Sequence, residues 1–222
     1  MSYFVFNGIR SDDMKIYIEH LPPIIKPPER YDLIKVDGSS VIGVDVKGYD
    51  VYEKTVPIGL KEADIGAVMN WLRGKGRLIF SNELDKYYDV YITSQIDYEK
   101  ALRFRKANIT FLTQPYKHAT GEEETTSRVV INQGNEKCLP LMTIYGSGSV
   151  DVLINGVKAC SLTLTDYITL DGEIEEAYKD NLNNLQNRKM IGKFPTLQPG
   201  INEISFTGTV TQVKTLVRSR WL

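Results

Sequence analysis

The stretch Phe194–Gly208 reads FPTLQPGINEISFTG, and it contains a turn followed by a strand. Pro199 presets φ for the first central position of a type II turn and Gly200 tolerates the positive φ of the second. The next residues alternate between two sides, with Asn202, Ile204 and Phe206 opposite Ile201, Glu203 and Ser205. This alternation predicts a half-buried strand that Gly208 ends, with Ile204 or Phe206 facing a core. A strand this late typically closes a sheet whose other strands came earlier.

Working back from this stretch, the second half of the chain reads as short strands separated by turns. We expect strands over 128–132, 139–145, 151–154, 157–161 and 167–170. Asn155-Gly156 is a strong signal for a two-residue hairpin, and Gly146-Ser147-Gly148 and Asp171-Gly172 predict further turns. Glu173–Met190 fits a helical face in part, but its asparagines favour a strand followed by a loop. Residues 128–222 are therefore expected to form a β-sandwich.

The first half is also predicted to be mainly β. Strands are expected over 3–7, 14–19, 77–81, 87–95, 98–104 and 106–113, the last stopped by Gln114-Pro115-Tyr116. Leu21–Glu29 carries four prolines and predicts an extended crossing segment. Tyr31–Asp37 and Val41–Lys47 flank a short loop and predict a hairpin. The alternating strand through Tyr52–Leu60 contains Pro57, which favours an edge position or a bulge.

One helix is predicted, over about 62–73. Ile65, Val68, Met69 and Leu72 have the i, i+3, i+4, i+7 spacing of an apolar stripe that covers a sheet. Glu62 and Asp64 suit the helix N-terminus, and Arg73 and Lys75 suit the other end.

A polar segment, Lys117–Ser127 (KHATGEEETTS), has no periodicity and predicts the domain boundary. The expected division is a β-rich N-terminal domain over 1–117, a linker over 118–127 and a C-terminal sandwich over 128–222. The acidic triplet Glu122–Glu124 is interpreted as a solvated face of the linker.

Composition places the chain among ordinary globular proteins. It has 222 residues, 42% hydrophobic and 25% charged, with a net charge of −1, which does not indicate general nucleic-acid binding. No apolar run is long enough for a membrane span, and the N-terminus lacks the features of a signal peptide. Synthesis in the cytosol is therefore expected. Cys138 and Cys160 could form a disulfide if their strands are neighbours, but free buried thiols are the favoured interpretation.

No catalytic constellation is apparent. His20 lies beside a proline segment and His118 lies in the linker. Gly146–Ser149 (GSGS) is neither a nucleophile elbow nor a dinucleotide fingerprint, and Gly74-Lys75-Gly76 lacks the spacing of a phosphate-binding loop. We therefore expect no catalytic, cofactor-binding or metal-binding residue, and a role in binding or assembly.

Several segments in order along the chain carry a resemblance to a known family. They read FVFNGIRSDDMKIYIEHLPPI, VDGSSVIG, MNWLRGKGRLIFSNELDKYYDVYI, ITFLTQPYK, INQGNEKCLPLMTIYGSGSVDVLING, LDGEIEEAYKDN, GKFPTLQPGINEISFTG and the terminal RSRWL. This series resembles the distal tail protein family of long, non-contractile-tailed phages (siphoviruses) or prophages of Gram-positive bacteria. The chain has no room for the inserted carbohydrate-binding domain of longer members, so the resemblance does not extend to direct receptor binding.

The resemblance implies a fold and an assembly. It implies a β-rich N-terminal domain that packs into a hexameric ring and a galectin-like or carbohydrate-module-like C-terminal sandwich. Implied partners are a tail tube protein, a tail-tip protein or tail-associated lysin, and receptor-binding or baseplate proteins. The implied location is the virion tail tip, with roles in host attachment and DNA passage.

The residues themselves suggest where a ring contact would form. Exposed strand edges can pair with a neighbour, and the candidate inter-subunit arm comprises Val36, Gly38, Val41, Ile42, Val44 and Pro57. The alternative is a free carbohydrate-binding sandwich or an accessory domain of a hydrolase. Its sugar-facing aromatics would be Tyr145, Tyr167 and Tyr178, for which core packing is the competing explanation.

Overall fold

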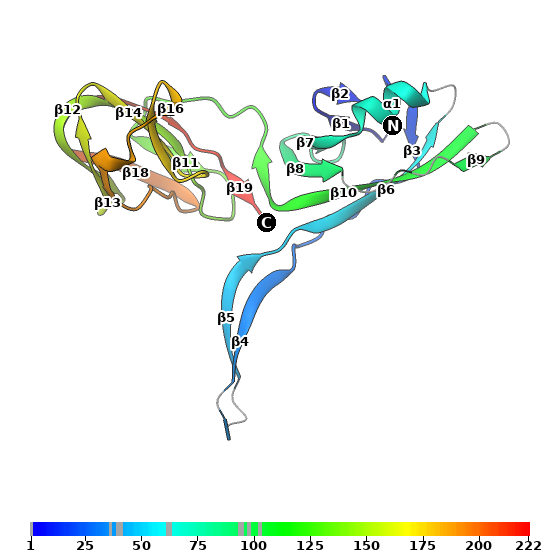
Figure 1. Cartoon of the computed structure of the whole chain (residues 1–222), viewed down its shortest axis with the longest axis horizontal. Helices are drawn as coiled ribbons and strands as arrows, with labels where there is room; N and C mark the ends of the chain where they lie inside the picture. The colour runs from blue at the N-terminus through cyan, green and yellow to red at the C-terminus, as the bar shows by residue number, and fades with distance from the viewer. Residues whose placement is uncertain are drawn as a thin grey trace. The chain divides into compact units, whose positions relative to one another are not determined.

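A computed structural model describes residues 2–35, 37–38, 42–60, 64–92, 96, 99–101 and 104–222. Two compact units make up the chain, residues 1–120 with Leu222 and residues 121–221. The described residues are mainly strands with one α-helix (Figure 1), which confirms the predicted fold class. None of their helices has the length and apolar character needed to cross a membrane.

The first unit is built on an antiparallel sheet with strand order β2-β1-β7-β8-β10-β6-β3, with β9 paired to β10. Its strands are β1 (Phe4–Phe6), β2 (Ile9–Arg10), β3 (Ile16–Ile18), β6 (Tyr52–Leu60), β7 (Gly74–Phe80), β8 (Lys86–Ile92), β9 (Glu99–Ala101) and β10 (Phe104–Ala119). A separate two-stranded sheet pairs β4 (Glu29–Lys35) with β5 (Ile42–Tyr49). Alternate residues of the main sheet form an apolar core that includes Phe4, Phe6, Val56, Ile58, Leu78, Val90, Ile109 and Phe111.

The helix α1 (Ile65–Trp71) covers this core over fewer residues than the predicted 62–73, of which 62 and 63 lie outside the described residues. Asp64 caps its N-terminus by accepting two backbone N–H bonds. Val68 is buried as predicted, but Met69 is 56% exposed, so its assignment to the apolar stripe was wrong. Trp71 takes the place over the sheet instead, because its ring stacks on Phe4 at 5.6 Å.

Two proline positions differ from expectation. The strand β10 does not stop at Gln114-Pro115-Tyr116 but continues to Ala119, because a bulge between Thr113 and Lys117 accommodates the proline. Pro57 is not at an edge, since β6 lies between β10 and β3. The Pro57 carbonyl accepts a hydrogen bond from the Glu19 N–H, and Glu19 lies one residue beyond the end of β3. In an antiparallel strand the N–H and C=O of one residue point to the same side, so the position where Pro57 lacks an N–H also faces the end of β3.

The second unit is a β-sandwich with strand order β11-β18-β12-β14-β15-β16, in which β13 pairs with β12 and β17. Buried residues of both layers form its core, among them Met142, Ile144, Val152, Leu162, Ile168 and Ile204. The elements are β11 (Val129–Asn132), β12 (Leu141–Ile154), β13 (Val157–Leu164), β14 (Tyr167–Asp171), β15 (Glu176–Lys179), β16 (Asn181–Leu185), the 3-10 turn η1 (Asn187–Lys189), β17 (Met190–Gly192), β18 (Gly200–Leu216) and β19 (Arg220–Trp221).

The two longest strands of the sandwich bend where turns or ends were predicted. Gly146 lies inside β12, and Gly208 lies inside β18 rather than at its end. A Cβ on Gly146 would approach the Thr209 carbonyl oxygen to 2.2 Å, and one on Gly208 would approach the Ser149 carbonyl oxygen to 2.4 Å. The glycines therefore permit a close crossing of two backbones at register shifts, which lets both strands continue through the bend.

The turns predicted at Asn155-Gly156 and at Pro199-Gly200 are confirmed, and one buried side chain bonds to both. Asn155 and Gly156 have φ of 52° and 78°, as a type I′ turn requires, and Gly200 has φ of 87°. Asn202 is fully buried and accepts bonds from the Gln198 N–H at 2.9 Å and the Asn155 side-chain amide at 3.0 Å. This asparagine thus fixes both turns relative to each other.

The polar segment Lys117–Ser127, in which the first unit ends and the second begins, is held by more contacts than a solvated linker. Lys117 is buried in β10 and pairs with Glu83 at 2.9 Å. Glu122 accepts the Ser219 N–H at 3.0 Å, so only the rest of the acidic triplet is a free, exposed face. Thr125 pairs with the backbone of Thr215. Side-chain and backbone contacts with residues far away in sequence hold this segment, and its composition gives no sign of them.

Glu173–Met190 begins as a strand, as favoured over the helix, but the expected loop is wrong. Two further strands and the turn η1 follow β15. Main-chain pairing explains the difference, because Tyr178 pairs with Leu185 despite the asparagines between them. Both cysteines are free and buried, as predicted, and burial raises the pKa of Cys138 and of Cys160 to about 12.

Candidate functional site

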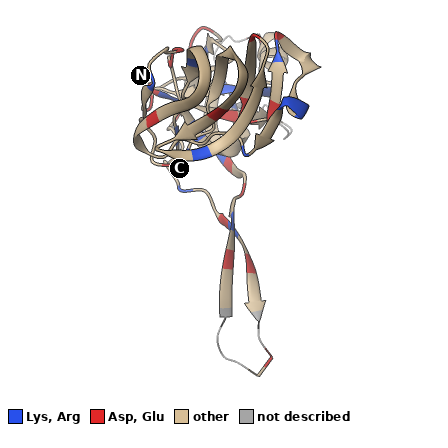
Figure 2. Ribbon diagram, turned by 90° about the vertical axis from the view of Figure 1, so that its left-hand side faces the viewer, with Lys and Arg blue, Asp and Glu red and all other residues tan. Residues whose placement is uncertain are grey.

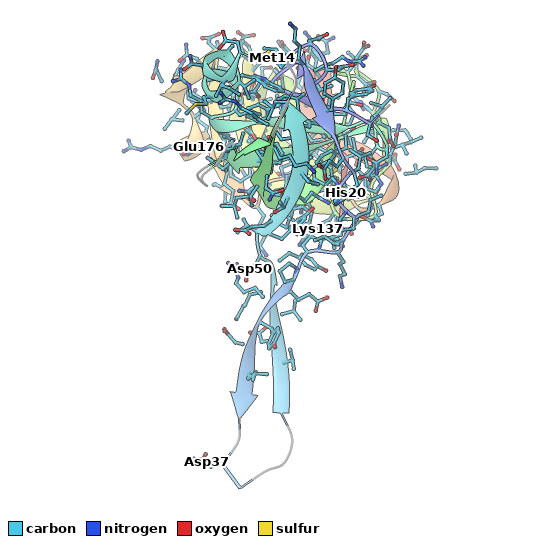
Figure 3. The ribbon with its side chains drawn as sticks, turned by 90° about the vertical axis from the view of Figure 1, so that its right-hand side faces the viewer. Met14, His20, Asp37, Asp50, Lys137 and Glu176 are labelled. Atoms are coloured by element: carbon cyan, nitrogen blue, oxygen red, sulfur yellow. The ribbon has the colours of Figure 1, made fainter. Side chains whose placement is uncertain are left out.

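The hairpin of β4 and β5, which we call the arm, extends away from the rest of the first unit (Figure 1). Figure 3 shows Asp37 at its tip and Asp50 at its base. The strands pair with each other from Glu29↔Tyr49 to Lys35↔Ile42, and among the described residues no other strand pairs with them. Both outer edges of the arm therefore present unpaired backbone groups.

One face of the arm is apolar and uncovered. The register places Tyr31 opposite Val46 and Leu33 opposite Val44, so all four side chains lie on the same face. Their exposed fractions are 51%, 55%, 51% and 58%. An isolated two-stranded hairpin is at best marginally stable in water, and an uncovered apolar face adds an unfavourable contact with solvent. The arm is therefore a surface suited to being covered.

The opposite face of the arm is mainly charged, although Ile34, which is 53% exposed, also lies on it. Asp32 and Asp45 lie opposite each other, and Lys47 forms ion pairs with them at 3.6 Å and 2.5 Å. In Figure 2 both strands of the arm are mostly tan with acidic residues on each. These exposed pairs contribute little to stability, but they offset like charges that face each other across the strands. The arm therefore has one face with four apolar side chains and one face that carries mostly charged side chains.

The base of the arm is held by contacts with the proline segment that precedes it. The Asp50 N–H donates to the Pro28 carbonyl at 2.9 Å. Lys26 pairs with Glu29 at 2.6 Å and its ammonium lies 5.7 Å from the centre of the Tyr49 ring. Tyr49 in turn meets Tyr116 of β10 edge to face at 6.1 Å. The direction in which the arm leaves the sheet is therefore set by packing.

A buried lysine anchors the same segment to the core of the unit. Lys54 on β6 is 3% exposed, and its ammonium donates to the Pro23 carbonyl at 2.7 Å. It lies 5.2 Å from the centre of the Tyr88 ring, whose hydroxyl donates to Glu83. Burial lowers the pKa of Lys54 to about 8, against the opposing effect of Glu83. Hydrogen bonding to Tyr88 and Lys117 keeps the pKa of Glu83 below its ordinary value despite burial.

The predicted arm residues fall in different places. Val44 lies on the apolar face, Gly38 lies in the connecting loop with φ of 77°, and Ile42 lies in β5. Val36 and Val41 lie outside the described residues. Pro57 is in the main sheet and lies outside the arm. Sequence reasoning missed Tyr31, Leu33 and Val46, although their period-two spacing in YDLIKV and VDV is the signal that could have found them.

The three candidate aromatics of the sandwich lie outside its core. Tyr145 and Tyr167 are register partners on β12 and β14, with ring centroids 5.1 Å apart, and Tyr178 lies on the neighbouring β15. Tyr167 donates its hydroxyl to Asp180. All three are half-buried on the face opposite Ile144 and Ile168, so the explanation by core packing was wrong.

Chemistry outside the arm is sparse. Within the described ranges, no group of three or more His, Cys, Asp or Glu residues is arranged to hold a metal ion. The raised pKa of each cysteine keeps its thiol protonated near pH 7, where a thiol is a poor nucleophile. His20 is exposed, and His118 stacks on Tyr87 with centroids 5.3 Å apart.

No family model matches the chain, and no curated protein matches it in sequence. Among solved structures, the chain is similar to the SPP1 Dit (gp 19.1) protein, described as a paradigm of the hub adsorption apparatus in Gram-positive infecting phages. That likeness has a TM-score of 0.74 and 15% identity over 100% of both chains. Chains of the phage p2 baseplate in its activated conformation, with Sr and with Ca, are similar with TM-scores of 0.53 and 0.52 and 9% identity over 97% of both chains. The chain therefore has, over its whole length, the fold of these phage hub and baseplate proteins.

Proposed function

We propose that this chain is a structural hub of a phage tail tip and a member of the distal tail protein family. The observation that carries the proposal is the similarity to a hub adsorption protein over the full length of both chains, which includes both units. The ordered sequence segments that resemble the family support it independently. The role is structural rather than enzymatic.

The hub assembles as a ring of six copies through the first unit, and the arm makes the contact. The partner that covers the apolar face of the arm is a second copy of this chain, because a closed cyclic assembly covers the same face on every subunit. An apolar face left open on each monomer would otherwise promote aggregation. The sandwich, residues 128–222, is a separately folding domain that does not contribute to ring formation. The number six comes from the resemblance to the family.

The ring places the chain between other tail components of the virion. Its partners are a tail tube protein on one side, a tail-tip protein or tail-associated lysin on the other, and receptor-binding or baseplate proteins around it. The resemblance to the family supports each of these partners, and the chain takes part in host attachment and DNA passage through them.

Assembly of matched arm variants tests the proposal. Leu33→Asp places a charge on the apolar face, and Ile34→Asp places the same charge on the opposite face of the same strand. We expect the unaltered chain and Ile34→Asp to form rings, and Leu33→Asp to remain monomeric. The measurement is light scattering coupled to size exclusion over a range of concentrations, with negative-stain micrographs, alone and with a tail tube protein as template.

The isolated second unit, residues 121–221, provides a further control and should remain monomeric. A chain that stays monomeric under all these conditions, with no ring on tail particles, would contradict the hub proposal. Equal assembly of both aspartate variants would instead retain the ring but remove the arm from its contact.

A second candidate, a carbohydrate-binding sandwich, is favoured by one observation. Tyr145, Tyr167 and Tyr178 lie on one face outside the core, on neighbouring strands, where a sugar ring could stack. Glycan-array binding that Tyr167→Ala abolishes, and that Tyr17→Ala in the first unit leaves intact, would support it. Absence of binding by the full chain would remove it.

A further inference from the structure

The sandwich contains a cavity of about 520 Å³ at the end that carries the two tight turns. This volume falls in the range of small-ligand sites, about 300–1,000 Å³. Ile154, Ala159 and Phe194 give it an apolar wall, and Thr196 and Gln198 line it with polar side chains. Among the described residues, neither of these polar side chains has a hydrogen-bond partner within the protein, so both are free to meet a ligand.

Three lysines line the cavity, and no acidic residue does. They are Lys137, Lys158 and Lys193, and each is exposed to solvent. Lys158 also pairs with Asp151 at 2.8 Å, outside the lining. In the part of the chain that the structure describes, Lys137 and Lys193 have no acidic partner. The cavity therefore carries an excess of positive charge that the protein itself does not balance.

Backbone contacts bring these lysines together from three separate segments. Cys138 and Leu197 pair through two backbone bonds, which places Lys137 next to the segment of Thr196 and Gln198. Lys158 follows the tight turn on β13, opposite Leu153. The Lys193 N–H donates to the Ala159 carbonyl at 2.9 Å. Because Asn202 fixes both turns beside them, the cavity walls are preformed, which lowers the entropic cost of binding.

We propose that this cavity binds a phosphate ester of a small polyhydroxylated compound. A phosphate ester can accept from several ammonium groups that approach as separate point charges, and lysine binds phosphate in this way. All three basic side chains here are lysines. Thr196 and Gln198 can bond hydroxyl groups, and the apolar wall with Phe194 packs against the carbon skeleton of the ester. This inference does not depend on the proposed ring.

The ester could be a free monoester or one unit of a phosphodiester polymer, and two probes distinguish these sources. The test is isothermal titration of the full chain with glycerol 3-phosphate and with bis-glycerol phosphodiester. Glycerol, sulfate and citrate serve as the neutral, inorganic and carboxylate comparisons. We expect at least one ester to bind with a Kd of about 1 mM or tighter, with an affinity that falls as salt is added, and glycerol not to bind.

Lysine variants assign the binding to the cavity. Lys137→Gln and Lys193→Gln should each weaken it about 3-fold or more, and the double variant about 10-fold. Lys158→Gln should have a smaller effect because Asp151 already balances that charge. Lys193→Arg should retain most of the affinity, and Lys189→Gln, outside the lining, should retain all of it. Ring formation should be the same in every variant.

Three results would overturn the inference. One is no binding of either ester at about 10 mM. Another is binding of sulfate or citrate as tightly as of the esters, which would leave only a general anion site. The third is binding of polyglutamate in preference to both esters, which would make the cavity a contact for an acidic polypeptide. The assembly measurements remain valid in each case, so failure here is distinct from failure of the hub proposal.

Discussion

The arm and the hairpin of β12 and β13 are built in the same local way but have opposite surroundings. Each is antiparallel with alternating apolar residues, and the connections contain Gly38 and Gly156 with φ of 77° and 78°. In the sandwich hairpin Val152 and Leu162 are buried, whereas the equivalent apolar face of the arm is about half exposed. An alternating pattern therefore predicts that a face will be covered, but the cover can come from the same chain or from another one.

The largest expected difference concerns one added charge on each hairpin. Val152→Asp buries a carboxylate in the sandwich core and should cost about 4 kcal/mol or more of unfolding free energy, enough to unfold the second unit. Val44→Asp lies on the uncovered face and should change stability by about 0.5 kcal/mol or less. Urea unfolding below the assembly concentration, followed by probes in each unit, measures both. A large loss for Val44→Asp would mean that the arm packs within its own chain.

The covering layer of the sandwich hairpin can be weakened directly. On β18, Ile204 pairs with Ile154 and is fully buried, while Phe206 pairs with Val152 and is only half-buried. Ile204→Ala should cost about 2–5 kcal/mol. Phe206→Ala should cost less, about 2 kcal/mol, because part of its ring already contacts solvent. Equal losses of unfolding free energy for the two variants in chemical denaturation would show that the bend at Gly208 buries the Phe206 ring.

The glycines of the two connections provide a smaller contrast. A β-branched residue at positive φ is strained, so Gly156→Val should destabilise the second unit by about 1–3 kcal/mol and spare the first. Gly38→Val introduces the same strain where it can be relieved by local opening of the arm. We expect thermal unfolding of the unassembled chain to be unchanged and ring formation to be weaker. A fall in the melting temperature of both units in either variant would argue against independent hairpins.

The root of the arm should give the smallest effect, through pH. Lys54 has a folded-state pKa of about 8, below its ordinary value, so between about pH 8 and 10 this side chain holds more of its proton in the unfolded state than in the folded state. Stability from this group therefore rises with pH in that window, by about 1 kcal/mol between pH 7.5 and 9. Lys54→Met should remove the rise, and Lys47→Met on the exposed arm should keep it.

Denaturant unfolding at a series of pH values, followed by a probe in the first unit, measures this slope apart from Cys138 and Cys160, whose raised pKa values give the second unit the opposite slope. The window ends near pH 10, because burial raises the pKa of Tyr52 to about 12 and the folded chain then retains protons that the unfolded chain loses. Parallel curves for the unaltered chain and Lys54→Met would contradict a buried, charged Lys54.

Prediction from sequence succeeded where local patterns and local chemistry agree. The alternation through Tyr52–Leu60 is matched by burial of every second residue of the strand, and the Asn155-Gly156 turn has the backbone that its residues favour. It failed where a distant partner changes the meaning of a signal. Pro115 is accommodated by a bulge and Pro57 faces the end of a neighbouring strand, so neither ends or exposes a strand.

The candidate sites show the same limit. The hairpin of the arm and the period-two spacing within each strand could be read from the sequence, but only the register shows that Leu33 meets Val44 and Tyr31 meets Val46 on one face. The lysines of the cavity are far apart in sequence and carry no shared motif. Only the pairing of Cys138 with Leu197, and of Lys193 with Ala159, brings them to one wall.

The sequence by itself determined the β-rich class, the single helix, the hairpins and their turns, because these depend on side-chain periodicity and on the φ preferences of glycine, proline and asparagine. Only the tertiary structure decided which faces are covered. Gly146 and Gly208 let two long strands cross closely and continue into the sandwich, whereas nothing in the chain covers the apolar face of the arm among the described residues. Burial is a property of neighbours, and neighbours in a β fold are set by pairing between segments far apart in the chain.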